Sequence, residues 1–144
     1  SMKIMGYEFE GYYRRIETIK GFFKFNMDLL CADVRKELFG NQPVYTKTRD
    51  DAPALYRDGA EVKNSLIADG CVIEGSVENC VLFRGVKVAK GAKVSNCILM
   101  QDTVIEEGAK LEYIIADKEV TVTAGKELKG TDSYPVYIVK HGRV

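Results

Sequence analysis

The sequence predicts a mainly-β protein whose second half is a parallel β-helix, and three observations carry that prediction. One six-residue pattern occurs four times, and its copies begin at Val62, Val77, Val94 and Leu111, at spacings of 15, 17 and 17 residues. Three glycines keep the same 17-residue period: Gly91, Gly108 and Gly125. Within a repeat, aliphatic residues recur every six positions, which is the hexapeptide spacing of a coil with three short strands.

The residues before these repeats predict different elements. Aromatic residues alternate over Tyr7–Tyr13 as in a strand. An apolar stripe predicts one amphipathic helix over Thr18–Phe39, with Thr18 as the N-cap and Gly40 as the C-terminal stop. The segment 41–58 contains Pro43, Pro53 and turn residues, so we expect an extended connector with a short strand at 44–47.

From Val62 onward the periodicity predicts the coils themselves. Each strand of a coil directs one aliphatic side chain into a narrow interior, and small residues fit the corners. The inward positions are expected at Ile73, Val88, Ile105 and Val122. An antiparallel sandwich would instead need two-residue turns and strict alternation, which the 17-residue period does not show. The shorter first repeat predicts a tight corner between Ile73 and Val77, and 136–139 are expected to form the last strand.

Stacked coils place equivalent residues in columns. Asn64, Asn79 and Asn96 share one position, so we expect a corner column that hydrogen-bonds to itself, with a binding role as the alternative. Cys80 and Cys97 share the next position and are expected to be buried thiols, because parallel columns rarely give the geometry of a disulfide.

Composition excludes several classes of protein. The chain of 144 residues has 21 basic and 21 acidic side chains, so it has no electrostatic footprint for nucleic acid or an anionic membrane. No apolar run approaches the roughly 18 residues that a membrane span needs. Its four cysteines are expected to be reduced core thiols of a cytoplasmic protein.

Two segments resemble a known family. Tyr13–Leu30 (YRRIETIKGFFKFNMDLL) resembles the junction between the nucleotidyltransferase and β-helix domains of glucose-1-phosphate adenylyltransferases (ADP-glucose pyrophosphorylases). Val62–Val86 (VKNSLIADGCVIEGSVENCVLFRGV) resembles the start of that family's β-helix. The resemblance implies a left-handed coil. It also implies that residues 1–40 are a remnant of the catalytic-domain end with the linker helix, 41–61 the connector and 62–144 the β-helix domain.

The family makes ADP-glucose and pyrophosphate from ATP and glucose 1-phosphate, with magnesium, for glycogen or starch synthesis. Its glycine-rich nucleotide loop does not occur in this sequence, so the resemblance implies no catalytic residues, no metal site and no cofactor here. Catalytic members carry Asp-Val-Gly-Thr where this chain has Arg15–Thr18 (RIET), and an arginine would repel the metal ion that the aspartate helps to hold. The chain therefore resembles the regulatory, GlgD-type subunit; the alternative is that Glu17 restores the metal site of a catalytic subunit.

The resemblance also implies an effector site. Val136–Lys140 resembles a C-terminal segment whose lysine contacts phosphorylated effectors in some members, so Lys140 is a candidate effector-binding residue, with His141 and Arg143 as further phosphate contacts. The alternative is that these basic residues form a solvent-exposed tail that binds no effector. The expected partners are a catalytic subunit or further copies of the chain, in a hetero- or homo-tetramer, and a small phosphorylated effector.

Two other functions fit the sequence to different degrees. A hexapeptide acyltransferase needs a histidine on a coil as general base, but the only histidine, His141, follows the repeats, so we expect no coil to carry a histidine and the sequence disfavours this function. A purely architectural module is compatible with regulation, because the open ends and flat faces of a β-helix invite contacts between subunits. Burial of the aromatic residues near 7–13 by self-association is expected.

Overall fold

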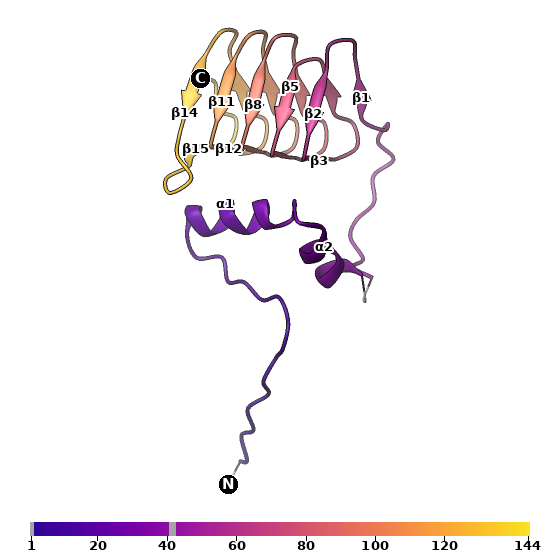
Figure 1. The fold of residues 1–144 in the computed structure, drawn as a ribbon, viewed down its shortest axis with the longest axis vertical. Coiled ribbons are helices and arrows are strands. Elements are labelled where there is room, and N and C mark those ends of the chain that lie inside the picture. Colours follow the sequence, from indigo (N-terminus) through magenta and orange to yellow (C-terminus); the bar gives the residue numbers. More distant parts are fainter. Residues whose placement is uncertain (1, 41–42) are drawn as a thin grey trace.

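The protein is described by a computed structural model that covers residues 2–40 and 43–144, in which fifteen short strands wind into a parallel β-helix (Figure 1). Sheet A contains β1 (Leu55–Tyr56), β4 (Val72–Ile73), β7 (Lys87–Val88), β10 (Val104–Ile105) and β13 (Thr121–Val122). Sheet B contains β2 (Glu61–Lys63), β5 (Ser76–Glu78), β8 (Lys93–Ser95), β11 (Lys110–Glu112) and β14 (Glu127–Lys129). Sheet C contains β3 (Leu66–Ile67), β6 (Val81–Leu82), β9 (Ile98–Leu99), β12 (Ile114–Ala116) and β15 (Val136–Ile138).

Strands within each sheet pair in parallel, which confirms the predicted β-helix and its last strand. The inward positions follow the period: Ile73, Val88, Ile105 and Val122 are at most 1% exposed. Ala92 fits a corner and is fully buried. Burial of each large aliphatic side chain contributes about 1.5–3 kcal/mol, so the column of interior residues is the main source of stability.

The predicted asparagine column forms one corner. Asn64, Asn79, Asn96 and Tyr113 all adopt left-handed backbone conformations, with φ of 40°, 51°, 51° and 56°. Asparagine tolerates this region better than most residues, which explains its recurrence. The side-chain amide of Asn64 donates to the Asn79 Oδ1 atom at 2.7 Å, so the expected contact is present between the first two asparagines of the column.

The cysteines follow the prediction with one exception. Cys71, Cys80 and Cys97 are buried free thiols, and the Cys97 N–H donates to the Cys80 Sγ atom at 3.4 Å. Burial raises the pKa of the Cys97 thiol well above its ordinary value, and the neighbouring Cys80 adds to the shift. Cys31 is exposed, so the expectation of four core thiols is wrong for this residue. It lies between the two helices and outside the β-helix.

The predicted single helix over Thr18–Phe39 is wrong, because it divides into α1 (Ile19–Asp28) and α2 (Ala32–Phe39). Thr18 caps α1 as expected, and its hydroxyl accepts the Gly21 N–H at 3.0 Å. Gly40 ends α2 at φ −77°, without the left-handed stop.

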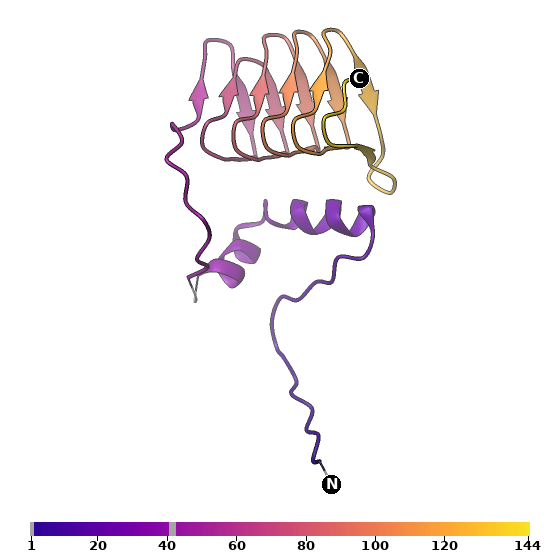
Figure 2. The ribbon, with the colours of Figure 1, turned by 180° about the vertical axis from the view of Figure 1, so that it is seen from behind.

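A packing constraint explains the break between the helices. Phe23 of α1 packs on Ile98 and Ile115 of sheet C, and α1 runs along the coils from the last toward the first (Figure 2). The turn at 29–31 lets the chain leave this face and continue to β1 at the first coil. No helix in the described chain has the length and apolar character that a membrane span needs.

The expected strands at 7–13 and 44–47 do not form, because neither segment has a neighbouring strand to pair with. Residues 2–17 extend away from the β-helix (Figure 1), and Tyr7, Phe9 and Tyr13 are 89%, 62% and 66% exposed. The boundary expected at residue 62 falls inside the first coil, since β1 already pairs with β4 and β2 begins at residue 61.

The shorter first repeat makes the predicted tight corner at Gly75. The N–H of the next residue, Ser76, donates to the Ala92 carbonyl, and a Cβ added at Gly75 would lie 2.4 Å from that same oxygen. The corner therefore accepts only glycine for reasons of space. Gly108, by contrast, has φ +67° and open space around the position of a Cβ, so there only the backbone conformation opposes a side chain.

Gly75→Ala should therefore lower the free energy of unfolding by about 3 kcal/mol, because a backbone carbonyl must move to admit the new methyl group. Gly108→Ala, the matched control, should cost only about 1 kcal/mol of left-handed strain. Urea denaturation of both variants measures the difference. Equal losses would show that the close approach at Gly75 does not constrain the coil.

Candidate functional site

One corner of the β-helix, between sheets C and A, gathers the candidate site. Each coil passes this corner with one residue in the left-handed conformation: Gly70, Gly85, Asp102, Glu119 and His141, with φ of 75°, 71°, 58°, 59° and 59°. A backbone hydrogen bond joins each of these residues after Gly70 to the coil before it. The His141 N–H, for example, donates at 3.0 Å to the carbonyl of Lys118, the residue that precedes Glu119, and the same bond recurs at Gly85, Asp102 and Glu119. The preceding residues therefore stack in a line, the corner column: Asp69, Arg84, Gln101, Lys118 and Lys140.

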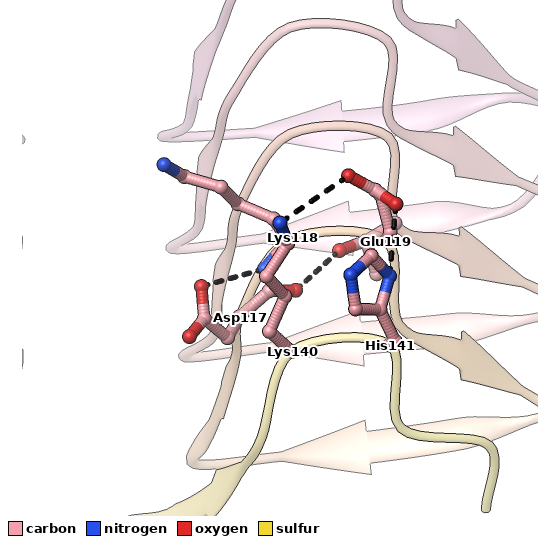
Figure 3. Close-up of polar contacts among 6 residues, drawn as sticks. Asp117, Lys118, Glu119, Lys140 and His141 are labelled. Atoms are coloured by element: carbon pink, nitrogen blue, oxygen red, sulfur yellow. Dashed lines mark hydrogen bonds and ion pairs between the residues drawn. The ribbon is translucent and has the colours of Figure 1, made fainter.

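The structure brings together two of the three residues predicted from the sequence. The Lys140 Nζ atom lies 3.8 Å from the Glu119 Oε1 atom, and the His141 Nδ1 atom lies 2.8 Å from Glu119 Oε2 (Figure 3). Arg143 is separate, because its Nη2 atom lies 4.0 Å from Glu106 Oε1 and its backbone bridges to Thr121 on sheet A. All these side chains reach solvent.

Sequence reasoning missed Lys118, which lies directly beside Lys140 in the corner column. The register of β12 with β15 pairs Ala116 with Ile138, a spacing of 22 residues in place of 17. Extra residues in the turn after β14, where Thr131 bridges to Tyr134, account for this longer step. A repeat alignment at 17 residues therefore could not place Lys118 beside Lys140.

A carboxylate next to these lysines is held in its charged form. The Tyr137 hydroxyl donates to the Asp117 Oδ2 atom at 2.7 Å, and the Lys118 N–H donates to Oδ1, also at 2.7 Å. These hydrogen bonds, and the charges of Lys118 and Lys140, lower the pKa of Asp117, while the same contact raises the pKa of Tyr137.

The corner thus holds basic side chains beside the protein's own carboxylates, with Glu119 in contact with both Lys140 and His141. An anionic ligand with several acceptor oxygens could replace Glu119 between Lys140 and His141, because phosphate accepts charge-assisted hydrogen bonds from both side chains. A crevice is lined by Thr18, by the first residues of α1 (Ile19 and Lys20) and by residues 133–137, and it lies next to this cluster because Tyr137 hydrogen-bonds to Asp117. It offers apolar and hydroxyl-bearing surface to the rest of a ligand.

The expectation that no coil carries a histidine is wrong, because His141 lies on the corner of the last coil and contacts Glu119. A histidine beside a carboxylate is a familiar general-base pair. However, the His141 side chain is 61% exposed, and it lies outside the lining of the neighbouring crevice. A general base for acyl transfer works in a concave site that holds both substrates, so this arrangement does not support an acyltransferase.

The structure also describes Arg15–Thr18, the segment that differs from the Asp-Val-Gly-Thr motif of the catalytic members. The Arg15 Nε atom lies 2.9 Å from Glu17 Oε1, so the carboxylate that could have replaced the missing aspartate is paired with arginine. Residues 2–40 and 43–144 contain no group of three histidine, cysteine or carboxylate side chains placed to hold a metal ion.

Comparison with known proteins gives consistent matches. The family model described as GlmU-like, C-terminal hexapeptide matches residues 52–134. The glycogen biosynthesis protein GlgD of Geobacillus stearothermophilus is 62% identical over 120 residues, which are 83% of this chain and 35% of that protein. GlgD of Bacillus subtilis is 42% identical over 95 residues, or 65% of this chain and 28% of that protein.

The glucose-1-phosphate adenylyltransferase of Geobacillus stearothermophilus is 42% identical over 89 residues, which are 61% of this chain and 23% of that protein. This chain therefore spans between about a quarter and a third of the length of these curated relatives.

The contact between Tyr137 and Asp117 makes a pH-dependent prediction. Because the folded pKa of Asp117 is lowered, the contact stabilises the fold above the ordinary carboxyl pKa, about 3.9, and this contribution is lost as the pH falls through the folded pKa. Tyr137→Phe should raise the pKa of Asp117 in a carboxyl NMR titration. It should also weaken the dependence of the free energy of unfolding on pH in the acid range. Tyr134→Phe, at a tyrosine that is 80% exposed, is the control. An unchanged Asp117 pKa in the Tyr137 variant would contradict the assignment.

Proposed function

The chain belongs to the GlmU-like C-terminal hexapeptide family, and from that premise we propose that it is the regulatory and assembly domain of a GlgD-type subunit in glycogen biosynthesis. One observation carries the proposal. The alignment with GlgD covers 120 of the 144 residues at 62% identity, so it extends beyond the repeats into the helical part, whereas the alignment with the adenylyltransferase covers 89 residues at 42%.

In this proposal the chain regulates transferase chemistry that a partner performs. The partner is the catalytic glucose-1-phosphate adenylyltransferase, which would convert ATP and glucose 1-phosphate into ADP-glucose and pyrophosphate and would supply the magnesium and nucleotide sites. The pairing of Glu17 with Arg15 supports this division of labour, because a guanidinium beside the carboxylate disfavours a divalent cation. Three buried free thiols support a cytoplasmic location.

The corner column supplies the proposed effector site. Lys140, His141 and the neighbouring Lys118 would bind the phosphate of a small phosphorylated effector, and Arg143 would take part only by leaving its contact with Glu106. Glu119 would hold the site in its unliganded state by occupying the position of the phosphate. Because the effector must displace the Glu119 carboxylate, this residue lowers the affinity for the effector. Substitution of a single charged residue should therefore change the binding constant.

Co-expression with the adenylyltransferase of the same organism tests the partnership. We expect the two chains to co-purify, and we expect the complex to differ from the catalytic chain alone in its response to phosphorylated activators, measured as ADP-glucose formation. This chain alone should form no ADP-glucose. Failure to co-purify, or transferase activity of this chain alone, would refute the proposal.

Titration calorimetry with fructose 1,6-bisphosphate and with inorganic phosphate tests the effector site. Lys140→Ala should weaken binding about tenfold, because a charge-assisted hydrogen bond is lost. Glu119→Gln should instead strengthen binding, because the competing carboxylate is removed. Lys126→Ala, an exposed lysine at another corner, should bind like the unmodified chain. Weaker binding by the Glu119 variant would show that Glu119 positions the cations and does not compete with the ligand.

A further inference from the structure

Sheet B carries two columns of polar and charged side chains on its outer surface, because the middle residue of each of its strands packs into the core. The first column is Glu61, Ser76, Lys93, Lys110 and Glu127. The second column is Lys63, Glu78, Ser95, Glu112 and Lys129. The surface between the columns is hollowed into two shallow grooves, one over β2–β8 and one over β8–β14.

The two columns carry opposite charges on three of the five coils (β2, β11 and β14), and on the other two a charged residue is paired with a serine, so no coil pairs like charges. We propose that sheet B docks against sheet B of a second copy of this chain, about a two-fold axis parallel to the axis of the β-helix. Such an axis keeps the coils in the same order and reverses the strands, so the first column of one copy faces the second column of the other. The facing pairs are then Glu61–Lys63, Ser76–Glu78, Lys93–Ser95, Lys110–Glu112 and Glu127–Lys129, and each occurs twice.

The alternative two-fold axis, along the strands, is unfavourable. It would place Glu61 opposite Glu127 and Lys93 opposite Lys93 of the second copy, and facing like charges oppose association. The other faces do not offer the same pattern. Sheet A presents Val72, Val104 and Thr121 at its outward positions, and sheet C is covered in part by α1.

A charge conflict within one chain supports the pairing. The register of β8 with β11 stacks Lys93 beside Lys110, and like charges on adjacent strands are destabilising. No ion pair among residues 2–40 and 43–144 includes Lys93 or Glu78, although Lys110 pairs with Glu127 and Lys129 with Glu112. In the proposed dimer Lys93 lies opposite Ser95, between Glu78 and Glu112 of the second copy, so the unpaired cation gains two carboxylates.

The size of the face sets the expected strength. Five strands at about 4.8 Å spacing span roughly 19 Å, which belongs to the small, weak class of interfaces. The contacts are ionic, so association should weaken as the salt concentration rises from about 0.05 M to about 0.5 M. This pairing does not depend on the proposed function.

Charge reversal at the first coil tests the proposal by sedimentation of a concentration series. Lys63→Glu puts a carboxylate opposite Glu61 of the second copy, and Glu61→Lys puts an ammonium group opposite Lys63. Each variant alone should dimerise about tenfold more weakly than the unmodified chain. An equimolar mixture of the two should recover association, because their first coils then attract. Lys87→Glu on sheet A, with the same change of charge as Lys63→Glu, is the control.

The exposed aromatic residues of the N-terminal segment offer a second route to association. We therefore repeat the series with Tyr7, Phe9 and Tyr13 changed to serine. Recovery by the mixture in this background supports sheet B pairing and also shows that both variants fold. A monomer at low salt, equal effects of the Lys63 and Lys87 variants, or no recovery in the mixture would overturn the proposal.

Discussion

In-register stacking of the coils is the constraint on which the rest of this structure depends. A two- or three-residue strand is too short to be stable alone, and its backbone groups find partners only when the coils before and after it hold the same register. The interior is filled by the inward side chains of the three sheets, so a shift by one residue would turn Ile105 or Val88 outward. The hydrogen bonds and the apolar core therefore select the same register.

This constraint also converts sequence periodicity into surfaces. Because equivalent residues stack, each outward position becomes a column with its own chemistry. One column brings Lys118 beside Lys140 at the corner, a pair of columns makes sheet B charged, and the outer side of sheet C is apolar where Phe23 of α1 covers it. In a β-helix, each position of the repeat therefore corresponds to one column of side chains on the surface, and a substitution at that position changes the chemistry of that column alone.

Much of this could be predicted from residues alone where the repeat is regular. The period of 17 placed the interior aliphatic residues and the corner at Asn79 and Asn96, since both follow from residue type and spacing. Prediction was less successful where contacts between residues distant in the sequence determine whether a helix or strand forms. The turn at 29–31 has no strong helix-breaking residue; it reflects the path of the chain from sheet C to the first coil. Likewise the strand expected at 44–47 had a suitable sequence but no partner.

The candidate site shows the same division. Sequence by itself determined the repeat, its inward and corner positions, and the basic character of the segment around Lys140, because each is a property of residue type and spacing. Only the tertiary structure decided that Lys118 joins Lys140 while Arg143 turns to Glu106, and that Glu119 occupies the space between Lys140 and His141. The reason is geometric: the last coil is longer than the others, and which side chains then face each other depends on the register of β15 on β12.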